Sequence, residues 1–113
     1  MSETLKDDSK IEVFRLQAEF CKSLSEPKRL RIIHELRNGE RSVSELAESL
    51  GMKQSNTSQH LAVLRKAGIV VPRREYSTVY YNLVSPRIAE ACDLVREVIA
   101  QQAQRNQRLT RVV

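Results

Sequence analysis

The sequence predicts a mainly α-helical domain that carries one small β-hairpin, and three observations lead to this fold class. Apolar residues recur at helical spacing over most of residues 10–100. Within 42–68, two short helical patterns are separated only by a turn around Gly51. The pattern then changes to two short runs of strand-forming residues, 69–71 and 79–83, before a final helix. The expected order is therefore four helices, two strands and a fifth helix in a single domain.

The first expected helix runs from about Lys10 to Leu24, after a flexible tail over residues 1–9. It has two apolar stripes. One stripe consists of Ile11, Phe14, Ala18 and Cys21, and the other of Val13, Leu16, Phe20 and Leu24. A helix that is apolar on two sides needs two partners. We expect one partner to be its own domain and the other a second copy of the chain.

The second expected helix starts with Ser25 as N-cap and Pro27 in the first turn, where the missing N–H of proline does no harm. It ends at Asn38-Gly39. Its core face is supplied by Leu30, Ile32, Ile33 and Leu36. His34 lies on the same helix, and a structural or solvent-facing role is expected for it before a ligand role.

The third and fourth helices form a helix-turn-helix. Ser42 and Glu45 have the spacing of a capping box. The apolar face of the third helix follows as Val43, Leu46, Ala47 and Leu50. Gly51 ends this helix, and the fourth helix extends from about Gln54 to Ala67, where Gly68 closes it.

The fourth helix has two faces with different chemistry. Its core side is formed by Thr57, Leu61 and Leu64. The other side presents Ser55, Asn56 and Gln59, which are uncharged and carry both donors and acceptors. Such groups can reach base edges in a DNA major groove.

The strands form a hairpin whose tip lies within residues 73–78. Pro72 cannot donate to a neighbouring strand, so the first strand is expected at a sheet edge. A hairpin that directly follows such a helix and carries Arg73 and Arg74 is the wing of a winged helix. Its arginines can contact phosphates or enter the adjacent minor groove.

Ser85 and Pro86 are expected to open the last helix as N-cap and first helical residue. Its apolar residues are Ile88, Cys92, Val95 and Ile99, at heptad-like spacing. Residues 101–113 are expected to form a basic C-terminal tail. The predicted dimer interface comprises Ile11, Phe14, Ala18, Ile88, Val95 and Ile99.

The charge distribution favours nucleic acid as the partner. The chain of 113 residues has a formal net charge of +5. Residues 52–74 contain five basic side chains and no acidic one, so the remainder is neutral overall. We expect DNA contacts from Lys53, Gln54, Ser55, Asn56, Ser58, Gln59, His60, Arg73 and Arg74. For His60, a packing role at the helix flank is an equally open alternative.

Other functional classes fit less well. A winged helix used only for protein contacts would be expected to expose large apolar or charged anchors. An enzyme is not expected, because there is no glycine-rich phosphate loop and no carboxylate cluster, and no cofactor is implied. Aromatic residues, at 4%, are too scarce for RNA stacking. No signal peptide or apolar run of membrane-spanning length is present, which predicts a cytoplasmic protein without membrane contact.

Four segments together resemble the ArsR/SmtB family of small dimeric winged-helix repressors. They are LSEPKRLRII at 24–33, SVSELAESLG at 42–51, QSNTSQHLAVLRKAGIV at 54–70 and RREYSTVYYNL at 73–83. The resemblance implies a homodimer formed by the first and last helices. It also implies binding to a palindromic double-stranded DNA operator and release by an inducer.

The sensing residues of that family are not matched. Its thiolate metal site needs cysteines in the ELAESL stretch, which has none. The positions of its zinc site in the last helix fall on Ser85, Arg87 and Val98, so no metal ligands are expected. We expect Cys21 and Cys92 to sense an oxidant or polysulfide instead. The alternatives are a metal- or metalloid-responsive repressor of the same fold, or a repressor with no inducer site of its own, in which both cysteines are only core residues. The sequence is compatible with pairing of the two cysteines either within one subunit or between subunits.

Overall fold

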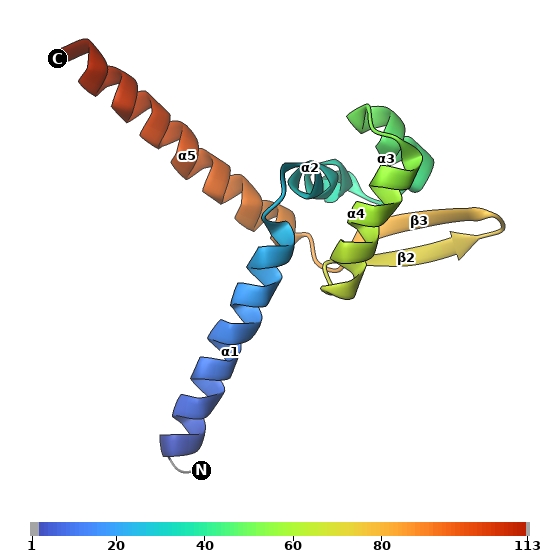
Figure 1. The fold of residues 1–113 in the computed structure, drawn as a ribbon, viewed down its shortest axis with the longest axis horizontal. Helices are drawn as coiled ribbons and strands as arrows, with labels where there is room; N and C mark the ends of the chain where they lie inside the picture. The colour runs from blue at the N-terminus through green and yellow to red at the C-terminus, as the bar shows by residue number, and fades with distance from the viewer. Residues whose placement is uncertain (1–2, 113) are drawn as a thin grey trace.

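The computed structural model describes residues 3–112, with side chains from residue 9 to residue 107. Figure 1 shows five α-helices and a β-hairpin, which confirms the predicted fold class. The elements are α1 (Glu3–Leu24), α2 (Pro27–Glu35), the short 3₁₀ helix η1 (Leu36–Asn38), β1 (Arg41–Ser42), α3 (Val43–Leu50), α4 (Gln54–Lys66), β2 (Val70–Glu75), β3 (Thr78–Leu83) and α5 (Arg87–Val112).

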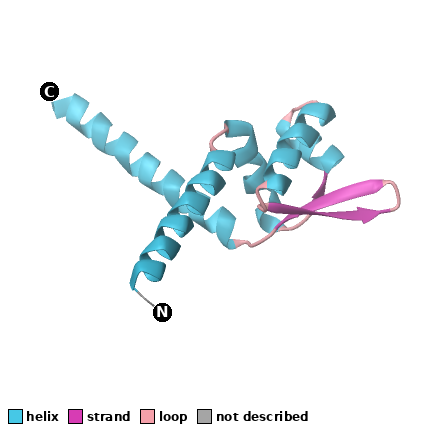
Figure 2. Cartoon of the chain, turned by 60° about the horizontal axis from the view of Figure 1, so that its bottom comes forward, coloured by secondary structure: helices cyan, strands magenta, loops and turns pink. Residues whose placement is uncertain are grey.

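The core lies where α2, α3 and α4 pack against the hairpin and the beginning of α5. Its fully or nearly fully buried members are Ile32, Ile33, Leu36, Leu46, Leu50, Leu61, Leu64, Ile69, Val70, Leu83 and Ala89. All are aliphatic, as the scarcity of aromatic residues requires. From this core, α1 and α5 diverge as two separate arms, and the hairpin projects from the opposite side (Figures 1 and 2).

The helix-turn-helix forms as the sequence predicts. The Ser42 hydroxyl accepts a hydrogen bond from the Glu45 N–H at 3.1 Å, and the Glu45 carboxylate accepts one from the Ser42 N–H at 3.0 Å. This reciprocal pair satisfies two N–H groups that a helix start leaves open. Gly51 then takes φ +62°, a left-handed conformation that glycine adopts without a steric penalty. Both ends of α3 are therefore defined locally, the first by side-chain hydrogen bonds and the last by the backbone conformation of a glycine.

The hairpin is longer and better anchored than expected. The strands β2 and β3 pair directly from Val70 opposite Leu83 to Glu75 opposite Thr78. The sheet order is β1-β3-β2, so Pro72 lies in an edge strand, as predicted. The two-residue strand β1 was not predicted, because it is too short to show a period. It attaches the hairpin to the start of α3, since Ser42 is both its last residue and the N-cap of α3.

Three expectations about helix ends were wrong. The N-cap of α2 is Glu26, whose carboxylate accepts from the N–H groups of Lys28 and Arg29, and not Ser25. The Ser25 hydroxyl instead donates to the Lys22 carbonyl at the end of α1. Within the described residues, both expected tails are helical, because α1 begins at Glu3 and α5 continues to Val112. Neither segment contains glycine or proline to stop a helix. No described helix is both long enough and apolar enough to cross a membrane.

Candidate nucleic-acid interface

The helix α4 separates a buried side from an exposed polar side. Thr57, Leu61 and Leu64 are fully buried. On the opposite side, Ser55 and Gln59 are exposed. The first two turns of α4 therefore present to solvent an uncharged face that is rich in hydrogen-bonding groups.

Several predicted residues surround this exposed face. Gln54 and Ser58 are exposed, and Asn56 is half-buried at its flank. Ala62 and Lys66 were not predicted to lie on this surface, although both are exposed. Their positions, three and seven residues after Gln59, show that they continue the same side of the helix.

The N-terminus of α4 is open. Lys53 is its N-cap residue and contributes no side-chain capping hydrogen bond. The Thr57 hydroxyl donates to the Lys53 carbonyl at 3.0 Å, which fixes the first turn from its buried side. The first N–H groups of a helix lack intrahelical acceptors and carry partial positive charge. Together with the exposed Lys53 ammonium, they make this end suitable for a phosphate.

His60 is directed toward the protein interior and not toward the polar face of α4. Its side chain is only 16% exposed, and Nδ1 lies 3.8 Å from a carboxylate oxygen of Glu26. The same nitrogen lies 3.5 Å from the Arg29 guanidinium. His60 therefore connects α4 to the start of α2. This geometry favours the packing role that the sequence analysis left open.

The two wing arginines have different surroundings. The Arg73 guanidinium donates two hydrogen bonds to Glu40, at 2.7 and 3.0 Å, and one to Glu75 at 3.2 Å. It also lies over the Tyr80 ring, 4.8 Å from the centroid. The hydrogen bonds from Arg73 lower the pKa of the Glu40 carboxyl. The Arg74 side chain is exposed and makes no ion pair or hydrogen bond with the residues that the structure describes.

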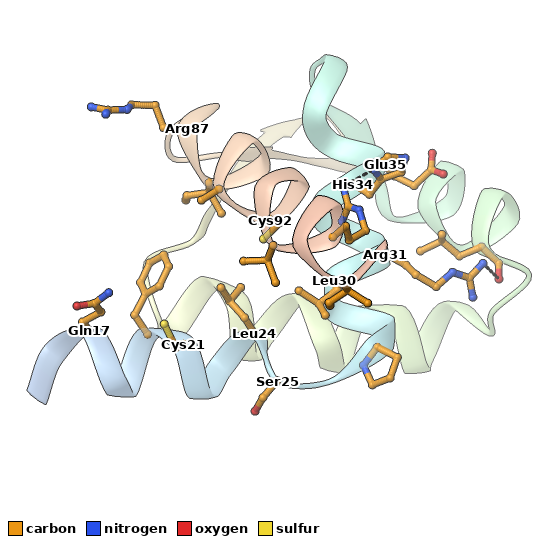
Figure 3. Close-up of a pocket in the computed structure, with 18 residues that line it drawn as sticks. Gln17, Cys21, Leu24, Ser25, Leu30, Arg31, His34, Glu35, Arg87 and Cys92 are labelled. Atoms are coloured by element: carbon orange, nitrogen blue, oxygen red, sulfur yellow. Dashed lines mark hydrogen bonds between the residues drawn. The ribbon is translucent and has the colours of Figure 1, made fainter. Parts of the chain in front are cut away.

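A second feature is an apolar groove of about 1040 Å³ between α1, α2 and α5 (Figure 3). Its walls include Phe20, Leu24, Leu30, Val95 and Ile99. Beyond it, the apolar side chains of both arms remain in water. Their exposed fractions are 67% for Ile11, 67% for Phe14, 59% for Val95 and 57% for Ile99. Of the other predicted interface residues, Ala18 is exposed and Ile88 is half-buried against the core.

Both cysteines line this groove, Cys21 from α1 and Cys92 from α5 (Figure 3). They are free thiols, with Cys21 exposed and Cys92 half-buried. Burial raises the pKa of the Cys92 thiol, although the Arg96 guanidinium acts in the opposite direction. Among the described residues, no three His, Cys, Asp or Glu side chains are grouped closely enough to hold a metal ion.

A polar cluster that the sequence analysis missed connects α5 to the end of α2. Asp93 accepts hydrogen bonds from Arg37, at 2.6 Å, and from Arg96. The same two guanidinium groups lie 3.4 and 3.3 Å from Nδ1 of His34. Arg37 and Asp93 are 56 residues apart, so no local pattern could have revealed this cluster.

The chain is similar to known proteins both in sequence and in fold. Residues 26–71 match the family model described as bacterial regulatory protein, arsR family. The chain is 43% identical over 90 residues to the HTH-type transcriptional regulator Rv0081 of Mycobacterium tuberculosis, which covers 79% of each chain. The crystal structure of Rv0081 superposes with a TM-score of 0.74 at 40% identity, covering 83% of this chain and 95% of that one.

Two further solved structures are similar. A homodimeric winged helix-turn-helix DNA-binding domain from Mycobacterium bovis, solved by NMR, has a TM-score of 0.76 at 31% identity and covers 87% of this chain and 91% of its own. The transcriptional repressor BigR from Xylella fastidiosa has a TM-score of 0.68 at 34% identity and covers 87% of this chain and 96% of its own.

Proposed function

The chain belongs to the arsR family of bacterial transcriptional regulators, and from this premise we propose that it is a repressor that binds a palindromic DNA operator as a homodimer. One observation carries the proposal. The helix α4 buries Thr57, Leu61 and Leu64 and leaves an uncharged, hydrogen-bonding face in solvent. A face of this size and chemistry fits the base edges of a major groove. The similar protein BigR is described as a transcriptional repressor, which supports repression as the mode of regulation.

Base contacts are assigned to the exposed side of α4. Gln59 and Ser55 lie at its centre, with Gln54 and Asn56 beside them. Glutamine and asparagine can pair with adenine through two hydrogen bonds, whereas serine is less selective. Ala62 adds a methyl group on the same side, which suits contact with a thymine methyl.

Backbone contacts are assigned to the surrounding groups. Lys53 and Ser58 flank the start of α4, and Arg74 is the free cation of the wing. Arg73 is held by two carboxylates, so we assign it to fixing the wing and not to a phosphate. His60 is likewise assigned to packing, because it faces Glu26 and is mostly covered.

The homodimer is assigned to the apolar sides of α1 and α5. Leaving Ile11, Phe14, Val95 and Ile99 in water would give a soluble protein an unusually large apolar surface. The similar Mycobacterium bovis domain is described as homodimeric. In a twofold dimer, the two α4 helices should lie roughly 34–36 Å apart, so that each enters one half-site of the palindrome.

Fluorescence anisotropy with DNA from the chain's own promoter tests the readout. Gln59→Ala should weaken operator binding by about 1–3 kcal/mol while leaving binding to shuffled DNA nearly unchanged. Gln101→Ala is the matched control, because it removes an exposed glutamine from α5 instead of α4. Equal losses on operator and shuffled DNA for Gln59→Ala would refute base readout by α4.

Release from DNA is assigned to the two groove thiols. An oxidant such as hydrogen peroxide would convert Cys21 and Cys92 to a disulfide: two protons and two electrons pass to the peroxide, which becomes two waters. Because Cys21 lies on α1 and Cys92 on α5, a covalent link would change how the two arms are placed. Cys21 is the more exposed of the two thiols, so the oxidant should react with it first.

An operator-release assay distinguishes the classes of inducer. The purified protein, bound to promoter DNA, would be exposed separately to peroxide, polysulfide, arsenite and zinc. Release by peroxide or polysulfide that disappears in both Cys21→Ser and Cys92→Ser supports the thiol pair. Release by zinc or arsenite that survives both substitutions supports a metal-responsive repressor. Release by the thiol reagents that is unchanged in both variants would show that the cysteines are only packing residues.

A further inference from the structure

The tip of the wing carries an aromatic side chain in an unfavourable position. Tyr76 is the first of the two residues that connect β2 to β3, and its side chain is 95% exposed. Its backbone φ is +55°, and within the described residues it is the only non-glycine residue with a positive φ. The DNA contacts assigned above do not use this residue.

Both features of Tyr76 are unfavourable for the protomer alone. The left-handed region brings the Cβ of an L residue close to its own backbone, so tight hairpin turns prefer glycine or asparagine there. A ring that is 95% exposed packs against almost nothing that could offset this strain. Strained backbone conformations of this kind cluster at active sites and ligand-binding sites. This position therefore points to a contact made outside the protomer.

The wing beneath Tyr76 is fixed to the body of the domain. Arg73 joins β2 to Glu40, which lies just before β1, and it also stacks on Tyr80 of β3. The strand β1 pairs with β3 and leads directly into α3. The tip is therefore held at a defined place relative to the helix-turn-helix.

The reach of the wing matches the spacing of DNA grooves. Six residue steps from Val70 to Tyr76 span about 20 Å at about 3.3 Å per step. The hairpin starts at the C-terminal end of α4, where the Ile69 N–H donates to the Leu64 carbonyl. One DNA turn is about 34 Å, so a minor groove lies roughly 17 Å from the centre of the adjacent major groove. An arm of this length suffices to carry its tip there.

We propose that Tyr76 is a DNA-binding residue whose ring enters the minor groove beside each half-site, while Arg74 contacts the phosphates along the arm. This inference rests on the proposed DNA-binding function. A phenol ring offers an apolar face to the sugars of a narrow groove and a hydroxyl to the acceptors on its floor. The contact would supply the favourable energy that offsets the strained turn.

The test compares Tyr76→Gly with Tyr76→Phe and with Val71→Ala, which removes an exposed apolar side chain from the same strand away from the tip. Tyr76→Gly should bind promoter DNA about tenfold more weakly, yet its Tm should rise by about 2–4 °C because the strain is relieved. Val71→Ala should bind like the parent to within about threefold. Tyr76→Phe keeps the ring and loses only the hydroxyl contact, so its affinity should lie between those of the parent and Tyr76→Gly. In a hydroxyl-radical footprint, Tyr76→Gly should lose only the minor-groove protection that flanks each half-site.

The outcomes separate this proposal from the one on which it depends. If the parent protein does not bind its promoter, the proposed function fails and this contact fails with it. If the parent binds, and Tyr76→Gly binds equally well with an unchanged footprint, only the assignment of Tyr76 is overturned. A loss of affinity with the flanking protection intact would also overturn it.

Discussion

Placing a charge in the seam of α5 should separate the proposed dimer without unfolding the protomer. Val95 lines the groove between α1, α2 and α5, and 59% of its surface remains exposed in the protomer. In the sequence, this residue belongs to the heptad-like series of the last helix. We predict that Val95→Glu gives a folded monomer that no longer binds operator DNA.

The size of the effect follows from the exposed fraction. Complete burial of a valine side chain contributes at least about 1.5 kcal/mol, and about three-fifths of it is still available here, so each subunit loses about 1 kcal/mol. A twofold interface contains the substitution twice. Each buried carboxylate adds a desolvation cost of its own, of order several kcal/mol if it is fully enclosed and unpaired. Even a partly enclosed pair should bring the total to about 4 kcal/mol, or about a thousandfold in the dimer dissociation constant.

Sedimentation velocity over a range of protein concentrations measures this directly. Gln101→Glu is the matched control, because it introduces the same charge at an exposed site on a different face of α5. The control should remain dimeric, and the far-UV circular dichroism of Val95→Glu should match that of the parent. A stable dimer for Val95→Glu at micromolar concentration would refute the α5 seam as the interface.

Three further predictions concern the wing, the cap and the polar cluster. Arg74→Ala removes one phosphate contact from each subunit of the dimer, so it should reduce the slope of log affinity against log salt by about 1.8 on any DNA. Arg73→Ala should change that slope less, because its guanidinium is already paired, and equal slope changes in titrations from low to high salt would contradict the division. Ser42→Ala should lower the free energy of unfolding by about 1–2 kcal/mol in urea titrations, and Ser44→Ala, on the exposed side of α3, should be nearly neutral. Asp93→Asn should weaken the attachment of α5 to α2, seen as faster amide exchange at the start of α5, and unchanged exchange there would refute the structural role of the cluster.

Sequence patterns alone were sufficient to predict the helix-turn-helix and the order of the elements. The reason is that the signals are local. Ser42 and Glu45 complete a capping box within one turn, and Gly51 provides the conformation that ends α3. The helical spacing of Thr57, Leu61 and Leu64 was sufficient to distinguish the buried face of α4 from its exposed face. Pro72 located an edge strand because its missing N–H excludes a central one.

Local signals failed where two adjacent residues competed for one role. Ser25 and Glu26 can both cap a helix, and no local pattern distinguishes between them. In the structure, Ser25 completes the end of α1, so Glu26 is left to accept from the first turn of α2. The lengths of α1 and α5 were also underestimated, because polar residues without glycine or proline are equally compatible with a helix and a loose tail.

The contacts between side chains from distant elements became known from the folded structure. It paired Arg73 with Glu40, whereas Arg74 has no ion pair within the part of the chain that the structure describes. It turned His60 toward Glu26, and it placed Cys21 and Cys92 along one groove although α1 and α5 are far apart in the chain. Hydrophobic spacing determines the face on which a residue lies, because that depends on a few neighbouring residues. Which other element packs against that face depends on how whole helices and strands are arranged. The shared core of α2, α3, α4 and the hairpin sets this arrangement.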